Sequence, residues 1–284
     1  MRSSGYLGPN GSGKTTTLKL LIQLLFPTAG SAEILGRPAG DLEVRRRVGF
    51  LPENPYFYDN LTAVELLNYF AGLFGLSQQD AGRRANSLLD RVGIGDERRL
   101  HLRKYSKGML QRVGIARALI NDPEVVFLDE PMSGLDPLGR RDVRDLILSL
   151  RDEGRTLFFS SHILTDAEAI CSRVAILSGG TLIAAVKIGE LGLKIRGWEL
   201  VVNGISSARA AALGPTVEGL TLVADGRYVI ELAADRRPEP IMAELLASGA
   251  QIVSLSPNHE SLEEFFVEQV KRQQDRVEGR LASA

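Results

Sequence analysis

The sequence predicts an α/β fold, in which helices cover a mainly parallel sheet, followed by a smaller α+β domain. Short apolar segments alternate with stretches of helical periodicity as far as about residue 191, an arrangement typical of parallel sheets. The chain has 284 residues, of which 44% are hydrophobic and 24% are charged, so it can bury one large core and one smaller core. We therefore expect domains at residues 1–191 and 192–272, followed by a polar tail at 273–284.

A glycine-rich segment near the N-terminus, GPNGSGKT, fits the P-loop pattern G-x-x-x-x-G-K-[ST]. In such a loop, Gly8, Gly11 and Gly13 would allow positive φ values and a close approach of the backbone to a phosphate. Lys14 would neutralise the phosphate, the Thr15 hydroxyl would hold Mg²⁺, and the following helix would direct its N-terminus at the anion. A chance glycine-rich turn is the alternative, but the pattern favours a nucleotide site.

Two further strand ends carry side chains suited to phosphoryl transfer. Asp129 and Glu130 follow the apolar strand predicted at residues 125–128, and Asp129 would orient Mg²⁺ beside the P-loop hydroxyl. Glu130 would accept a proton from the water that attacks the γ-phosphoryl group. His162 follows the strand predicted at residues 156–159, from where it could bind the γ-phosphate and hold the water and Glu130 in register. Two solvated acids at a strand end are the alternative interpretation.

Capping and turn residues place the other elements of the first domain. Thr62 with Glu65 makes a capping box, and Ser106 can cap a helix. Pro52 ends a strand and leaves Glu53 at its carboxyl end, where α/β sheets bind their ligands. The expected helices are residues 15–26, 65–74, 80–92, 106–120 and 138–153, and the helical subdomain is residues 61–122. The expected strands are residues 1–6, 32–35, 48–51, 125–128 and 156–159, with the segments 167–171, 174–177 and 182–186 completing the alternation.

The second domain is predicted to have a ferredoxin-like fold. Its apolar segments follow the order strand, helix, strand, strand, helix, strand, and Asp225-Gly226 is a strong hairpin signal. A last helix should begin at Leu262, capped by Ser261, and pack its two phenylalanines. The tail from Gln273 is polar enough to be disordered. The strands are expected at residues 198–202, 220–224, 228–232 and 252–255, and the helices at 208–213 and 241–248.

Composition excludes several classes of protein. The net charge is −1 and the pI about 6.4, which gives no electrostatic reason to expect a nucleic-acid partner. The single cysteine, Cys171, cannot form an internal disulfide, and no apolar signal region follows the N-terminus, so a reducing cytoplasmic location is expected. Because no apolar run reaches spanning length, contact with a membrane would require a partner.

The N-terminal strand is unusual, since Ser3 and Ser4 stand where a buried parallel strand should be apolar. Tyr6 is expected under the loop on the phosphate side. The polar residues suggest a misassigned start or a truncated reading frame.

Taken together, five blocks in order resemble the ATP-binding subunit of ABC transporters over about residues 5–180. They are GPNGSGKTT, the strand end with Glu53, YSKGM with QRVGIARAL, VVFLDEP, and SGLDP followed by SSH. By this resemblance, the loop beginning at Ser106 is the signature loop, which contacts the nucleotide held by an opposite subunit, and Asp136 is the acid between subunits. Lys107 and Glu53 depart from the residues common in the family and are similar to a subgroup of bacterial exporter ATPases with separate membrane subunits. Lys107 could add charge near the partner's nucleotide or extend into solvent, and solvent is favoured because most surface lysines are solvated.

The resemblance implies a head-to-tail dimer with a second ATP-binding subunit, two bound ATP with Mg²⁺, and an integral-membrane permease partner. The family ordinarily has two strands and an adenine-stacking aromatic residue ahead of the P-loop, and Tyr6 cannot replace that aromatic. The resemblance therefore also implies that the chain as given lacks these strands, binds ATP weakly and exposes an unpaired sheet edge. The location would be cytoplasmic and peripheral on the inner face of the cell membrane. The expected catalytic residues are Glu130, His162 and Lys14, and the expected metal ligands are Thr15 and Asp129. The expected nucleotide-binding residues are Gly8, Pro9, Asn10, Gly11, Ser12, Gly13, Lys14, Thr15, Thr16, Glu53, Ser106, Lys107, Gly108 and Asp136.

Three alternatives remain at this point. A soluble ABC ATPase acting on a non-transport macromolecular partner usually carries long coiled coils or two ABC units in one chain, and neither is found in the sequence. A degenerate module that does not hydrolyse nucleotide should lose Glu130 or His162, and both are present. A P-loop kinase would lack the YSKGM block.

Overall fold

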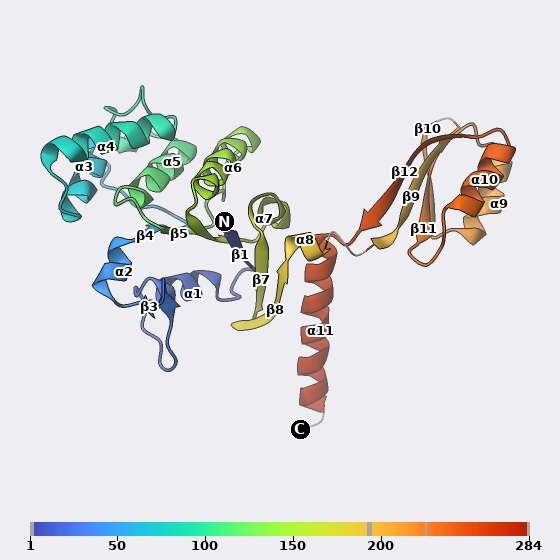
Figure 1. Ribbon diagram of the computed structural model, residues 1–284, viewed down its shortest axis with the longest axis horizontal. Coiled ribbons are helices and arrows are strands. Elements are labelled where there is room, and N and C mark those ends of the chain that lie inside the picture. Colours follow the sequence, from blue (N-terminus) through green and yellow to red (C-terminus); the bar gives the residue numbers. More distant parts are fainter. Residues whose placement is uncertain (1–2, 192–194, 225, 283–284) are drawn as a thin grey trace. The chain divides into compact units, whose positions relative to one another are not determined.

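The computed structural model describes residues 3–191, 195–224 and 226–282 of the chain (Figure 1). The chain divides into two compact units, one of residues 1–187 with 269–284 and the other of residues 188–268. The helix α8 (Ile188–Leu191), where the domain boundary was predicted, opens the second unit. The predicted first residue of the second domain, residue 192, lies outside the described residues.

A six-stranded sheet in the order β4-β5-β6-β1-β7-β8 forms the centre of the first unit. Its strands are β1 (Ser3–Leu7), β4 (Val48–Leu51), β5 (Val125–Asp129), β6 (Thr156–Ser161), β7 (Arg173–Ser178) and β8 (Thr181–Lys187). The first five are parallel, and β8 pairs antiparallel with β7. The sheet therefore brings the carboxyl ends of β1, β4, β5 and β6 to one edge, where the predicted catalytic segments follow.

The polar residues of β1 have partners inside the sheet. The strand pairs with β6 on one side and β7 on the other, and Ser3 is only 1% exposed. The Ser3 hydroxyl donates a hydrogen bond of 2.8 Å to the carbonyl of Ile170 and accepts one of 3.0 Å from the backbone N–H of Ser172. The expectation that a buried strand must be apolar is therefore wrong here, because both hydrogen-bonding functions of this hydroxyl are satisfied.

Aromatic side chains pack on the sheet beside β1. The ring centroids of Tyr6 and Phe158 lie 5.3 Å apart, and those of Phe127 and Phe158 lie 5.5 Å apart. Tyr6 thus packs against the neighbouring strand β6, whose Phe158 in turn packs against β5.

The helices and short strands of the first unit surround this sheet. The helices are α1 (Lys14–Leu21), α2 (Leu42–Arg46), α3 (Ala63–Leu73), α4 (Gln78–Arg91), η1 (Leu102–Lys104), α5 (Lys107–Ala118), α6 (Pro137–Asp152) and α7 (Leu164–Ile170), and β2 (Glu33–Ile34) pairs with β3 (Arg37–Pro38). The predicted extent of α1 to residue 26 is wrong, because Gln23 has a left-handed φ of 59° that breaks the helix. The strand predicted at residues 32–35 is likewise reduced to two residues.

Helices α3, α4 and α5 form the predicted helical insertion (Figure 1). The capping box of Thr62 and Glu65 is present, and the Ser106 hydroxyl accepts a hydrogen bond from the backbone N–H of Met109. Among the described residues, no helix is long and apolar enough to cross a membrane.

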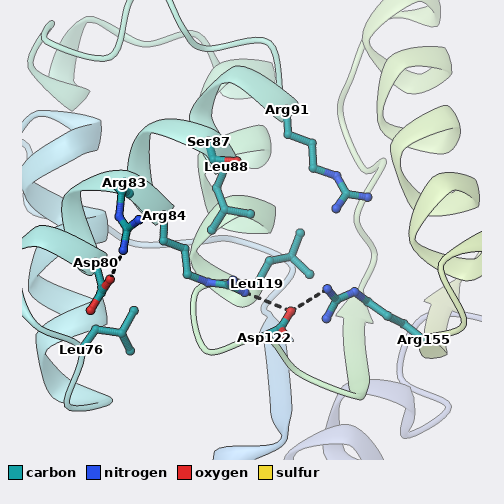
Figure 2. Close-up of a pocket in the computed structure, with 10 residues that line it drawn as sticks. All are labelled: Leu76, Asp80, Arg83, Arg84, Ser87, Leu88, Arg91, Leu119, Asp122 and Arg155. Atoms are coloured by element: carbon teal, nitrogen blue, oxygen red, sulfur yellow. Dashed lines mark hydrogen bonds and ion pairs between the residues drawn. The ribbon is translucent and has the colours of Figure 1, made fainter.

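A cleft of about 490 Å³ separates α4 from the amino ends of the sheet strands. Figure 2 shows Arg84 of α4 and Arg155 ahead of β6 converging on Asp122 from its two sides. Arg84 also donates to the carbonyls of Leu119 and Ile120 at the end of α5. The cations lining this cleft thus have carboxylate or carbonyl partners within the protein, and their contacts tie the helical insertion to the rest of the unit.

The second unit has the predicted ferredoxin-like topology. Its sheet has the order β10-β11-β9-β12, with all neighbouring strands antiparallel. Its strands are β9 (Ile195–Asn203), β10 (Gly219–Ala224), β11 (Arg227–Ala233) and β12 (Gln251–His259), and its helices are α9 (Ser207–Leu213), η2 (Gly214–Thr216) and α10 (Glu239–Ala247). A core that includes Leu200, Ile230 and Leu245 joins the sheet to these helices. Gly226 has the positive φ of a hairpin turn, and Asp225 lies outside the described residues.

The prediction of a disordered tail from Gln273 is wrong for the described residues, because the last helix α11 (Leu262–Ala282) continues through them. The helix begins as predicted, with the Ser261 hydroxyl accepting from the backbone N–H of Glu264. Arginine, glutamine, glutamate, leucine and alanine, which occur from Gln273 onward, are good helix formers, and a helix that has already nucleated can propagate through them.

Candidate functional site

The P-loop follows β1 and leads directly into α1. Gly11 and Gly13 have positive φ values of 78° and 100°, which side chains with a Cβ rarely adopt. Gly8 does not have a positive φ. A glycine is needed there because neighbouring atoms come too close to its Cα to leave room for a side chain. A Cβ on Gly8 would lie 2.4 Å from the Ser12 Oγ and 2.5 Å from the carbonyl oxygen of Leu177, so alanine cannot replace it without a shift of the loop. Pro9, Asn10 and Gly11 of the loop are exposed, as is Thr16 in the first turn of α1.

Lys14 is the first residue of α1 and is only 7% exposed. Its Nζ donates to the backbone carbonyls of Gly8 and Pro9 at 2.8 and 3.3 Å, and it lies 3.6 Å from Oε1 of Glu130. The ammonium group is thus held between the P-loop backbone and the acid at the end of β5. A buried cation at the start of a helix that follows a glycine-rich loop is suited to binding a phosphate.

A buried carboxylate stands next to the P-loop hydroxyl. Asp129, the last residue of β5, is 1% exposed, and the Thr15 hydroxyl donates to its Oδ1 at 3.2 Å. One carboxylate and one hydroxyl form the kind of donor set that fits Mg²⁺, which in nucleotide sites completes its coordination with phosphate oxygens and water. Thr15 and Asp129 would therefore hold this ion together with a nucleotide.

Glu130 has an unusual backbone conformation for a side chain of its type. Its φ is 47°, in the left-handed region that glutamate seldom adopts. This bend directs the carboxylate back over the site, where Oε2 lies 2.8 Å from Nδ1 of His162 and Oε1 faces Lys14. The glutamate is 7% exposed, whereas 44% of the His162 side chain is exposed. Glu130 thus connects a buried cation to a partly exposed imidazole, and a strained residue so placed is typical of catalytic centres.

The structure does not bring the remaining predicted residues to this cluster. Ser106 caps α5, and Asp136 caps α6 by accepting a 2.7 Å hydrogen bond from the backbone N–H of Gly139. Glu53 lies exposed in the loop after β4. The Lys107 side chain extends over Gly134, where an added Cβ would lie 2.2 Å from the lysine Nζ, and Gly108 faces Leu135. Glu53 lies in a loop, and the other residues lie at the N-terminal ends of α5 and α6. None of them takes part in the contacts described around Lys14.

Sequence reasoning missed Ser160 of β6. This serine is fully buried, donates to Oδ1 of Asp129 at 2.6 Å and accepts from the backbone N–H of Glu130 at 2.9 Å. The available signal was a small polar residue at the carboxyl end of an otherwise apolar strand, directly across from the acid pair. Parallel pairing of Ser160 with Asp129 places it there.

Comparison with known proteins finds one family model and several relatives, all of them ATP-binding components of ABC transporters. The family model described as "ABC transporter" matches residues 3–133. An "Uncharacterized ABC transporter ATP-binding protein" of Synechocystis sp. is 46% identical over 272 residues, which are 94% of this chain and 74% of that protein. The "Bacitracin transport ATP-binding protein BcrA" of Bacillus licheniformis is 35% identical over 272 residues, covering 93% of this chain and 86% of that protein.

A solved structure also resembles the chain. It is the dimeric structure of an ATP-binding cassette in a post-hydrolysis state, bound to ADP and phosphate. The TM-score is 0.61 at 27% sequence identity, and the match covers 66% of this chain and 85% of the other.

Proposed function

The chain belongs to the ABC transporter family of ATP-binding subunits and is an ATP hydrolase, and from this we propose that two such subunits close around ATP to drive an export permease in the membrane. The main observation in support is that the side chains of four residues lie together at one edge of the sheet: Lys14, Glu130, His162 and Asp129. These groups are what phosphoryl transfer to water requires: a cation for the phosphates, a proton acceptor, and a site for the accompanying metal.

We assign a different role in ATP hydrolysis to each residue of this site. The P-loop backbone and Lys14 would bind the β- and γ-phosphates. Thr15 and Asp129 would hold Mg²⁺, which would supply positive charge to the phosphates. Glu130 accepts the proton of the attacking water. His162 hydrogen-bonds Glu130 at 2.8 Å and keeps its carboxylate aimed at the water.

A second subunit would complete the nucleotide site. Ser106, Lys107, Gly108 and Asp136 belong to the motif blocks, yet they lie apart from the P-loop of their own chain. The similar structure bound to ADP and phosphate is dimeric, which supports a pair of subunits. In the head-to-tail pair that we propose, the signature loop of one subunit would face the P-loop of the other. Closure of such a pair on ATP would supply the mechanical step.

The permease would dock on the loop after β4 and on α3. Tyr56, Tyr58 and Tyr69 are 92%, 66% and 54% exposed on these segments, and exposed aromatic residues are common in protein interfaces. Arg117 of α5 lies over the rings of Phe57 and Phe70, 5.7 and 5.4 Å from their centroids. This stacking connects the two segments, so a displacement near Glu53 would reach the helical insertion. Attachment to a permease would place the subunit on the inner face of the cell membrane.

The Glu130→Gln variant tests the proposal. The amide preserves the shape of the side chain but removes the proton acceptor, so turnover should fall by about 10²-fold or more while ATP still binds. The variant should form a stable dimer with ATP and Mg²⁺, detected by size-exclusion chromatography with light scattering, and return to monomer when ATP is removed.

Glu33→Gln, which changes an exposed carboxylate on β2, is the matched control and should keep wild-type turnover. Wild-type turnover in Glu130→Gln at saturating ATP would contradict the role of Glu130. A Glu130→Gln variant that binds ATP and stays monomeric would contradict dimer closure.

A further inference from the structure

We propose that Ser160 is a positioning residue that fixes the separation and orientation of Asp129 and Glu130; this inference rests on the proposed ATPase function. The serine does not touch the P-loop in the described contacts. Its hydroxyl lies between the carboxylate of one acid and the backbone of the next.

The hydroxyl can satisfy both neighbours in only one way. A serine hydroxyl has one proton to donate and lone pairs to accept with. Because the Asp129 carboxylate can only accept, the proton goes to its Oδ1 at 2.6 Å, and a lone pair receives the Glu130 N–H at 2.9 Å. Ser160 is 0% exposed, so water cannot replace either bond. The two acids are therefore anchored to one buried oxygen atom.

The second bond fixes the unusual backbone of Glu130. With its φ at 47°, Glu130 points its side chain toward Lys14 and His162 and not along the strand. Such a conformation persists only where surrounding contacts over-determine it. Ser160 holds the Glu130 N–H, and the Glu130 carbonyl accepts a second hydrogen bond of 3.0 Å from the backbone N–H of Ser133. Of these two backbone contacts, the one to Ser160 ties the residue to the neighbouring strand β6.

The first bond orients the metal ligand. The Thr15 hydroxyl and Ser160 both donate to Oδ1 of Asp129. Hydrogen bonds to a ligating carboxylate fix its direction, and loss of such outer partners typically lowers metal affinity or activity 10- to 100-fold. Ser160 thus acts on the metal through Asp129 and on the proton acceptor through Glu130.

The test compares three variants. Ser160→Ala removes the hydroxyl, and Ser160→Cys keeps nearly the same volume with a much weaker donor. Ser3→Ala is the matched control, because Ser3 is equally buried, also donates one bond and accepts one, and lies at the opposite end of the same sheet. A purely structural role would make Ser160→Ala and Ser3→Ala alike in both melting temperature and turnover.

We expect both Ser160 variants to lose about 10- to 100-fold in kcat with a change in KM below about threefold, while Ser3→Ala keeps its kcat. A second readout is independent of turnover. In the non-hydrolysing Glu130→Gln background, calorimetry with ATP plus Mg²⁺ and with ATP plus EDTA gives the gain in affinity due to the metal. Ser160→Ala should reduce that gain about tenfold or more.

A wild-type kcat in Ser160→Cys, or an unchanged metal-dependent gain in Ser160→Ala, would overturn the inference. An equal loss of kcat in Ser3→Ala would also overturn it, because the effect would then be general to buried serines. Failure of the unsubstituted chain to bind ATP would contradict the proposed function and not the placement of Ser160.

Discussion

Nζ of Lys14 and Oε1 of Glu130 lie 3.6 Å apart, with both side chains more than nine-tenths buried. The P-loop and the end of β5 are separated by more than a hundred residues in the sequence, and the parallel order of β1, β6 and β5 brings them together. Because the ion pair is shielded from most solvent, the two charges stabilise each other more strongly than the charges of a surface pair would.

Substitutions of the two partners of this ion pair should nevertheless have different effects on ATP affinity. Lys14→Ala removes the charge that faces the phosphates, so ATP affinity should fall by about tenfold or more. Glu130→Gln should keep ATP affinity within about threefold of wild type, because the carboxylate acts on water and not on the nucleotide. Equilibrium titration with a fluorescent ATP analogue checks both, and equal affinities in the two variants would contradict these roles.

His162 should affect turnover more than binding. Its Nδ1 contacts Oε2 of Glu130 at 2.8 Å, and its backbone N–H points at the same oxygen from 3.4 Å. His162→Ala removes the side-chain contact only, so kcat should fall by about 10²-fold while the backbone contact keeps Glu130 partly in place.

Steady-state kinetics of His162→Ala separate the two parameters, and His101→Ala is a suitable control. His101 is exposed, and its Nδ1 contacts the carbonyl of Asn60 in the helical insertion. A rise in KM without a fall in kcat for His162→Ala would show that the histidine binds ground-state nucleotide instead of orienting the acid.

Most residues of the candidate site could be predicted from the sequence, because the strands of this sheet are short, apolar and followed at once by polar residues. Each of β4, β5 and β6 was expected within two residues of its observed ends, and the acids and His162 follow from those ends. Capping residues were equally informative, since Thr62, Ser106 and Ser261 each accept the backbone N–H that a cap should.

What could not be predicted depended on contacts between distant segments. Ser3 and Ser160 are both buried serines in strands, and only the pairing of β1, β5 and β6 shows which groups satisfy them. The end of α1 depends on one left-handed residue, Gln23, that periodicity does not reveal. The tail of α11 shows the opposite error, because low hydrophobicity was taken to exclude a helix that local propensity favours.

The bridge between the helical insertion and the sheet gives the last prediction. Hydrogen bonds from Arg155 and then from Arg84 lower the pKa of Asp122 below its ordinary value of 3.8. A carboxylate whose pKa is lower in the folded state stabilises the protein above its unfolded pKa, and that stability is lost as the pH falls through the folded pKa. The contribution should therefore be full at pH 7 and disappear at a pH below about 3.8.

Asp122→Asn isolates the charge in this bridge. The φ of Asp122 is 55°, and asparagine adopts this left-handed conformation as readily as aspartate, so the substitution adds no backbone strain. Because 65% of the Asp122 side chain is exposed, solvent screening limits the expected loss to about 1 kcal/mol at pH 7. Urea unfolding of Asp122→Asn, wild type and the control Asp96→Asn should show a difference at pH 7 that shrinks toward pH 3.5. A difference that stays constant with pH, or one matched by Asp96→Asn, would show that the charge of Asp122 does not hold the insertion to the sheet.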